Sequence, residues 1–101
     1  MEKDMTTTKQ KQKLALTWHV DDGHEWLHAS RQQLMALGLT HKSFSPYSYT
    51  HPTHGGVYAE GDCDAIILYR AAKSAGLEIV AAEQRHAGHA PCKRYVRCGS
   101  R

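Results

Sequence analysis

The sequence contains no long run of apolar residues. A helix that crosses a bilayer needs about 20 predominantly apolar residues in a row, and no part of this chain approaches that length. Residues 1–13 also lack the apolar segment that forms the centre of a secretory signal. We therefore expect a cytoplasmic protein that does not contact a membrane.

Cysteine is scarce, and its count is odd. The chain has three cysteines, Cys63, Cys92 and Cys98. Without an export signal, an odd number favours reduced thiols over a disulfide framework. A glycine-rich phosphate loop is missing too, because Gly55 and Gly56 do not have the spacing of a nucleotide-binding motif. We interpret these two glycines as part of a turn.

The 101 residues suffice for one domain and are too few for two ordinary ones. With 41% hydrophobic residues, the composition is that of a folded chain. Residues 1–12 are polar and without periodicity, which predicts a flexible N-terminal tail. We expect a single domain at residues 13–98 and a short C-terminal tail at residues 99–101.

The most regular pattern runs from residue 58 to residue 84 and predicts a strand, a helix and a second strand. Apolar residues with the spacing of one helical face are Ala65, Leu68, Ala72 and Ala75. Asp62 is expected to cap this helix, and Asp64 to add negative charge to its first turn. Gly76 is expected to end the helix, because glycine readily adopts the left-handed conformation found there. Alternation from Leu77 onwards predicts the second strand.

A hairpin is predicted at the start of the domain. Apolar and other residues alternate from Leu14 to Val20, as in a half-buried strand. Asp21-Asp22-Gly23 is typical of a tight turn, and residues 24–28 form the predicted return strand. Ser30 and Gln33 then have the spacing of a capping box at the start of a short helix.

Three further strands complete the prediction, at residues 44–50, 56–60 and 92–98. In the first of them, Tyr47 and Tyr49 are two residues apart and would share a face. The element order β-β-α-β-β-α-β-β predicts an α+β fold with a mainly antiparallel sheet of about five or six strands and both helices on one face. The second helix would form a crossover that gives one parallel pair.

Eight histidines suggest a possible metal site. The closest grouping is His86, His89 and Cys92, with Cys98 further along, and these residue types are zinc ligands. If residues 92–98 are extended, however, the two sulfur atoms share a face but lie about 20 Å apart, too far for one ion. We therefore expect no cofactor, and a zinc module or small metal-dependent enzyme built on these four residues remains an alternative.

Residues near the second helix could also support catalysis. Glu60, Asp62 and Asp64 resemble a metal or acid–base group, but their place at a helix start explains them more simply. Cys63 in the same segment could have a lowered pKa and act as a nucleophile. A small buried apolar group is its more ordinary role. We therefore expect no catalytic residue and a protein that is not an enzyme.

Basic residues are concentrated after Glu83, and no acidic residue follows. Such a basic end attracts nucleic acid or an acidic protein surface. A second candidate patch lies on the helix side opposite the predicted core. The predicted partner-binding residues, drawn from these two regions, are Arg85, Lys93, Arg94, Tyr95, Arg97, Arg101, Ile66, Arg70 and Lys73.

Four tyrosines could extend the basic surface. They are Tyr47, Tyr49, Tyr58 and Tyr95. Proteins that bind single-stranded nucleic acid stack bases on such rings, although tyrosine is also an ordinary strand residue with a packed ring and an exposed hydroxyl. Direct nucleic-acid binding therefore stays open as an alternative.

The segments LGL (37–39), YSY (47–49), VYAEGDCDA (57–65) and AGLE (75–78) resemble those of small, mostly uncharacterised bacterial α+β proteins carried on phages, plasmids and integrated elements. The likeness covers residues 18–97 and rests on structural residues. It implies an accessory role in a bacterial cytoplasm. Together, these patterns favour a non-enzymatic binding or modulator protein that recognises a macromolecule of the host or of the element through its basic C-terminal surface.

Overall fold

The computed structural model describes residues 12–98, and the remainder of both predicted tails lies outside the described part. Gln12, which we assigned to the N-terminal tail, belongs to the first strand. The elements are β1 (Gln12–Val20), β2 (Glu25–Ala29), α2 (Arg31–Leu37), η1 (His41–Ser43), β3 (Tyr49–Thr50), β4 (Val57–Glu60), α3 (Ala65–Ser74), β5 (Leu77–Arg85), η2 (Pro91–Arg94) and β6 (Val96–Arg97).

The described strands form one six-stranded sheet in the order β5-β1-β2-β4-β3-β6. β1 and β5 are parallel along their whole length, whereas the other neighbouring strands are antiparallel. The predicted α+β class with two helices is confirmed, whereas the predicted mainly antiparallel sheet is only partly correct, because the sheet is mixed and its longest strand pair, β1–β5, is parallel. The crossover through α3 does not place β5 beside β4. It carries the chain past β2 and β1, so that β5 lies at the edge of the sheet and pairs with β1.

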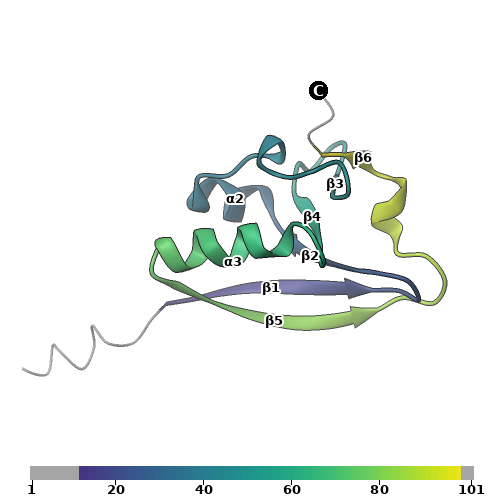
Figure 1. Cartoon of the computed structure of the whole chain (residues 1–101), viewed down its shortest axis with the longest axis horizontal. Helices are drawn as coiled ribbons and strands as arrows, with labels where there is room; N and C mark the ends of the chain where they lie inside the picture. The colour runs from purple at the N-terminus through teal and green to yellow at the C-terminus, as the bar shows by residue number, and fades with distance from the viewer. Residues whose placement is uncertain (1–11, 99–101) are drawn as a thin grey trace, which may run out of the picture.

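Helices α2 and α3 lie on the same face of the sheet (Figure 1). Both helices contribute to the main hydrophobic cluster together with alternate residues of three strands, as the period of two in a strand requires. Its central members are Leu16, Leu27, Ala29, Leu34, Val57, Ala59, Ala65 and Leu68. This cluster anchors the sheet to its helical layer.

The opposite face of the sheet carries a second, smaller cluster. It consists of Trp26, Ala90 and Cys92, with Tyr49, Tyr58 and Tyr95 packed against them. Figure 1 shows the chain leaving the end of β5, passing through η2 and reaching β6 beside β3. We call residues 86–98 the C-terminal arm, because they cover part of the face that has no helix.

The predicted capping box of the first helix is confirmed. The Ser30 hydroxyl accepts a hydrogen bond from the Gln33 amide at 3.2 Å, and the Gln33 side chain accepts one from the Ser30 amide at 2.9 Å. Gly38 and Gly76 have φ values of 74° and 77° at the ends of α2 and α3. In that left-handed region a side chain would be strained, which explains why glycine ends both helices.

The predicted capping of the second helix is wrong. The helix begins at Ala65, so Asp62 lies outside it, and Asp64 occupies the N-cap position without a side-chain cap bond. The Asp64 carboxylate instead accepts hydrogen bonds from the amide and hydroxyl of Ser45, both at 2.8 Å, and from the Ser48 hydroxyl. It therefore tethers the turn before β3 rather than the start of α3.

The strand predicted at residues 44–50 is much shorter in the structure, where β3 contains only Tyr49 and Thr50. The turn from Ser45 to Ser48 is closed by its own backbone hydrogen bond of 3.1 Å, which leaves only two residues to β3. Tyr47 consequently projects into solvent, with 63% of its surface exposed, while Tyr49 packs in the second cluster. The prediction that the two rings share a strand face is therefore wrong.

The strand predicted at residues 92–98 is mostly absent as well. Pro91 opens the short helix η2, and only Val96 and Arg97 form a strand. Cys92 is buried in the second cluster, whereas Cys98 is buried in the main cluster. The predicted common face of the two sulfur atoms is therefore wrong, because the arm turns between them.

Candidate functional site

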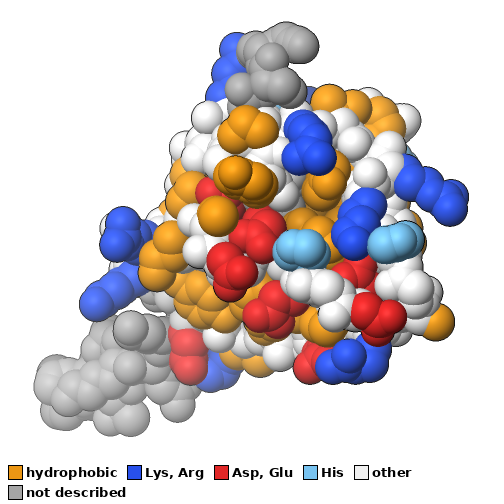
Figure 2. Space-filling model, turned by 45° about the vertical axis from the view of Figure 1, so that its right-hand side comes forward, with side chains coloured by type: hydrophobic (Ala, Val, Ile, Leu, Met, Phe, Trp, Pro, Cys, Tyr) orange, Lys and Arg blue, Asp and Glu red, His pale blue; other side chains and the backbone are white. Residues whose placement is uncertain are grey.

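Two adjoining hollows lie at the end of the sheet where β1 turns into β2. The acidic hollow, of about 250 Å³, is lined by residues 20–25, Glu60 and Asp62. The aromatic hollow, of about 370 Å³, adds residues from β2, β3, β6 and η2. Both share His24, Glu60 and Asp62. Figure 2 shows acidic, basic and hydrophobic side chains meeting on one face of the molecule.

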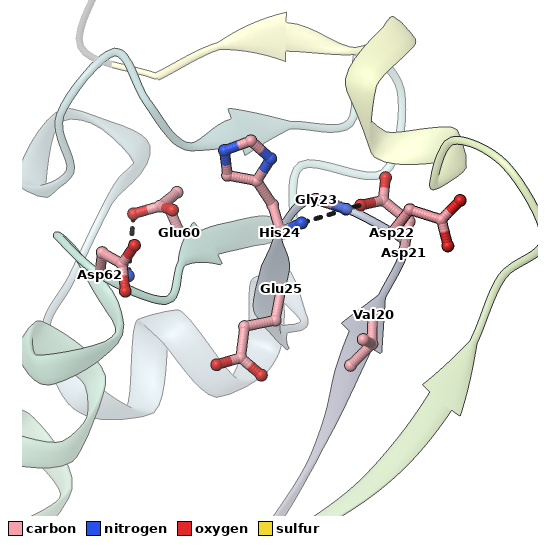
Figure 3. A pocket seen from close by; sticks show the side chains of 8 residues that line it. All are labelled: Val20, Asp21, Asp22, Gly23, His24, Glu25, Glu60 and Asp62. Carbon is pink, nitrogen blue, oxygen red and sulfur yellow. Dashed lines mark hydrogen bonds between the residues drawn. The ribbon is translucent and has the colours of Figure 1, made fainter.

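The acidic hollow has carboxylates on both sides. Figure 3 shows Glu60 and Asp62 on one side, Asp21 and Asp22 on the other, and His24 between them. Asp22 and Asp62 are exposed, whereas Asp21 and Glu60 are buried at 5% and 7% exposure. The exposed carboxylates therefore give the hollow its accessible negative charge.

Asp21 is fully engaged inside the protein. One carboxylate oxygen accepts hydrogen bonds from the amides of Gly23 and His24 at 3.0 Å, and the other accepts one from the Ala90 amide at 2.9 Å and faces the Lys93 ammonium at 3.1 Å. Burial alone would raise the pKa of Asp21, but these hydrogen bonds outweigh it and hold the pKa below its ordinary value. Asp21 thus fastens the C-terminal arm to the β1–β2 turn.

Glu60 has a comparable structural role. Its Oε1 atom accepts hydrogen bonds from the amides of Asp62 and Cys63, both at 2.9 Å. These bonds shape the turn that leads from β4 to α3 and explain why a glutamate ends this strand. The buried carboxylates of the site are therefore satisfied mainly by backbone amides, an arrangement typical of structural acids.

Trp26 is the most deeply buried residue that lines the aromatic hollow, with 2% of its surface exposed. The Lys93 ammonium lies 5.4 Å from the centre of its ring, within cation–π range. The indole Nε1 atom is buried and has no hydrogen-bond partner among residues 12–98. The hollow thus has a rigid aromatic wall bearing a positive charge.

Arg97 and two tyrosines complete the aromatic hollow. The Arg97 guanidinium lies 5.3 Å from the Tyr49 ring and donates a hydrogen bond to the Pro46 carbonyl at 2.9 Å. This bond ties β6 to the turn that carries Tyr47. The exposed Tyr47 ring therefore lines the hollow from a turn that is held on two sides.

The predicted basic surface is only partly gathered at this site. Lys93 and Arg97 line the aromatic hollow, and Arg94 is exposed on η2. Tyr95 is half-buried in the second cluster. Arg85 lies at the end of β5. The C-terminal basic residues therefore do not form one continuous face.

The predicted helical patch is separate from both hollows. Ile66, Arg70 and Lys73 are exposed on α3, and none of them lines either hollow. Arg101 lies outside the described residues. The four predicted tyrosines also divide, since Tyr47 and Tyr49 line the aromatic hollow while Tyr58 and Tyr95 contact each other elsewhere in the second cluster.

The structure does not bring the four predicted zinc ligands together. His86 contacts His19 through ring nitrogens 2.9 Å apart, and His89 is exposed beside Lys93. Burial raises the pKa of both Cys92 and Cys98 to about 12, which disfavours the thiolate that binds metal. Among residues 12–98, no set of three or more His, Cys, Asp or Glu side chains is arranged to hold a metal ion.

Cys63 does not have the lowered pKa that a nucleophile at a helix start would have. Desolvation and the neighbouring carboxylates of Glu60, Asp64 and Asp62 raise its pKa above the ordinary value. The alternative role as a buried apolar group is wrong too, because Cys63 is exposed. Its place at the rim of the aromatic hollow makes it an accessible thiol.

Sequence reasoning missed a row of contacting rings on the face without helices. His19, His28 and Tyr58 lie side by side on three neighbouring strands, with ring centres 4.4–6.0 Å apart. His86 and Tyr95 of the C-terminal arm add to the row. His28 and Tyr58 each lie between two buried apolar residues, and His19 lies between the half-buried Trp18 and Val20. Alternation in the sequence was therefore the pattern that could have revealed this row.

Comparison of the chain with family models, with curated proteins and with solved structures found no match. Of the helices in the described part of the chain, none has the length and apolar character needed to cross a bilayer. The functional argument therefore rests on the geometry of the two hollows.

Proposed function

We propose that this protein is a non-enzymatic binding module that recognises a segment of another protein through the two hollows. The observation that carries the proposal is the convergence of Trp26, Tyr47, Tyr49 and Arg97 in one surface hollow. Tryptophan, tyrosine and arginine are the residues most enriched where protein partners bind tightly. A hollow of about 370 Å³ suits an inserted side chain and its neighbours.

The distribution of charge favours a protein over a nucleic acid as the partner. Glu60 and Asp62 line both hollows, and Asp22 and Glu25 line the acidic one. These carboxylates would repel a phosphate backbone, which binds best where basic residues are unopposed. A peptide segment can instead place a basic side chain in the acidic hollow and an apolar or acidic one beside Arg97.

The sequence resemblance supports a cellular location and a kind of partner for this role. A small accessory protein of a bacterial mobile element would act in the cytoplasm by occupying a surface of a host or element protein. Nucleic-acid binding through Lys93, Arg94 and Arg97, with bases stacked on Tyr47 and Tyr49, is the second candidate. The cation–π contact of Arg97 with Tyr49 favours that alternative, since single-strand binders use such pairs.

Affinity capture from a nuclease-treated bacterial lysate tests the proposal with two matched double variants. Tyr47→Ala with Arg97→Gln alters the aromatic hollow, whereas Tyr69→Ala with Arg70→Gln makes the same changes on α3. We expect a specific protein to be retained by the wild type and the α3 variant and lost from the hollow variant. Rising salt should weaken this binding, because charges at the rim are screened.

Two outcomes would contradict the proposal. Loss of the captured protein only from the α3 variant would move the binding surface to the predicted helical patch. Capture from an untreated lysate but not from the nuclease-treated one, together with a gel shift of a single-stranded probe, would identify nucleic acid as the partner.

A further inference from the structure

A third pocket lies away from the two hollows and shares no residue with them. It measures about 240 Å³, and its lining includes His28 of β2, Arg31 of α2, Tyr58 of β4, and His51, His54 and Gly56 of the β3–β4 connection. We call it the histidine pocket. No carboxylate lines it, in contrast to the acidic and aromatic hollows. Its lining favours a ligand that is negatively charged.

The hydrogen bonds of His51 determine which ring nitrogen remains available. The His51 Nδ1 atom accepts hydrogen bonds from the amides of Thr53 and His54 at 3.0 and 2.9 Å. An imidazole that accepts at Nδ1 carries its proton on Nε2. The ring therefore offers an N–H donor rather than a lone pair, which suits an oxyanion and not a metal ion.

Arg31 supplies a positive charge that has no partner in the described part of the chain. Its guanidinium forms no ion pair or hydrogen bond within residues 12–98. A Cβ atom at Gly55, where φ is 75°, would lie 3.3 Å from the Arg31 Cδ atom, so the side chain passes directly over this glycine. The glycine thus allows Arg31 to lie against the loop that carries His51 and His54.

Two further wall residues, His28 and Tyr58, are partly buried and uncharged at neutral pH. Burial, followed by the charges of His19 and His51, lowers the pKa of His28 to about 4. A Cβ atom at Gly56 would lie 2.9 Å from the His28 Nε2 atom, and the His28 ring lies 4.4 Å from that of Tyr58. The pocket therefore has one closely packed wall at His28, Gly56 and Tyr58, one permanent cation and an imidazole N–H donor.

We propose that the histidine pocket binds a phosphate group, with Arg31 supplying the charge and the His51 Nε2–H group donating a hydrogen bond. Guanidinium and phosphate form strong charge-assisted hydrogen bonds. The pocket is smaller than the roughly 300–1,000 Å³ typical of sites for whole drug-sized ligands. It therefore accommodates inorganic phosphate or the terminal phosphate of a small phosphate monoester. The site is independent of the proposed protein-binding surface.

Titration followed by NMR of the histidine ring protons tests this site. The probes are inorganic phosphate and adenosine monophosphate, each compared with sodium chloride at equal ionic strength. We expect phosphate to produce saturable shifts of the His51 and His54 rings, and Arg31→Gln to weaken binding about tenfold or more. Arg70→Gln, which removes an exposed arginine on α3, should leave the affinity unchanged.

The two probes distinguish the sources of the phosphate. Equal affinities would identify inorganic phosphate as the sufficient ligand, whereas tighter binding of the nucleotide with additional Tyr58 shifts would identify a monoester. The proposal would be overturned if sodium chloride reproduced the shifts, or if Arg31→Gln and wild type bound phosphate equally. Retained ring shifts elsewhere in the Arg31→Gln spectrum would show that the variant is folded.

Discussion

Replacing Asp21 by asparagine should release the C-terminal arm while preserving the β1–β2 turn. The asparagine oxygen can still accept from the amides of Gly23 and His24, which hold the turn. The amide nitrogen, in contrast, would face two donors, the Ala90 amide and the Lys93 ammonium. The variant therefore separates attachment of the arm from formation of the turn.

The expected loss of stability of arm attachment follows from the two contacts that this buried carboxylate loses. The Asp21 side chain is 1% exposed and that of Lys93 is 27% exposed. Hydrogen bonds to a charged group contribute about 1.5–3 kcal/mol each, and the partial exposure of Lys93 places its contact at the low end. We expect Asp21→Asn to lower the stability of arm attachment by about 3 kcal/mol.

Reaction of the Cys92 thiol with a thiol reagent measures this opening. Cys92 is 1% exposed and packs against Trp26, so it reacts only when the arm detaches. In a Cys63→Ser background, which removes the exposed thiol, a loss of about 3 kcal/mol should accelerate labelling of Cys92 about a hundredfold. Mass spectrometry identifies the labelled cysteine, and circular dichroism distinguishes detachment from global unfolding.

Asp22→Asn is the matched control, because it makes the same change at the exposed neighbouring position. Equal labelling rates in Asp21→Asn and Asp22→Asn would refute the reasoning. The pKa of Asp21 is held below its ordinary value, so its contribution is complete above the unfolded pKa of about 3.9 and is lost as the pH falls below it. Relative to the labelling rate of the unfolded chain at the same pH, labelling of the wild type should accelerate in that acidic range, and the variant should lack this relative acceleration.

Two further predictions concern the histidine pocket and its surroundings. Gly56→Ala should destabilise the protein by about 1–3 kcal/mol, because the added Cβ atom would lie 2.8 Å from a carbonyl oxygen of β2. Gly23→Ala has nothing within 4 Å of the added atom, and equal thermal midpoints for the two variants would contradict the packing argument. Since burial lowers the pKa of His28 to about 4, the unfolded chain binds more protons between that value and about 6.5, and stability should rise with pH across this window. Urea unfolding at about pH 5 and about pH 7 should show a smaller rise for His28→Gln, and an identical rise would exclude His28 as its source.

Local patterns predicted those elements whose ends are determined by neighbouring residues. Ser30 and Gln33 bond to each other across three residues, and glycine alone adopts the helix-ending conformation at Gly38 and Gly76 without strain. The alternation from Leu14 to Val20 likewise predicted β1 correctly. These features were readable because both partners of each interaction lie within a few residues.

The wrong or incomplete predictions include side chains whose partners are distant in the sequence. Asp64 resembled a helix acid, but it bonds to Ser45 and Ser48. Asp21 resembled a turn residue, and it also holds the amide of Ala90, 69 positions away. Local spacing could not identify these partners, because a carboxylate can accept hydrogen bonds from amides and hydroxyls anywhere in the chain that the fold brings near it.

The sequence by itself determined the α+β class, the presence of two helices, the Ser30 capping box and the glycines that end both helices, because these depend on periodicity and on interactions within one turn of the chain. Only the tertiary structure decided that β5 pairs with β1, that the C-terminal arm folds back onto Trp26, and that Arg31 meets the loop of His51. Those contacts join segments from separate parts of the chain. Their formation depends on which surfaces remain uncovered after the sheet and helices have packed, and no local pattern of residues records that outcome.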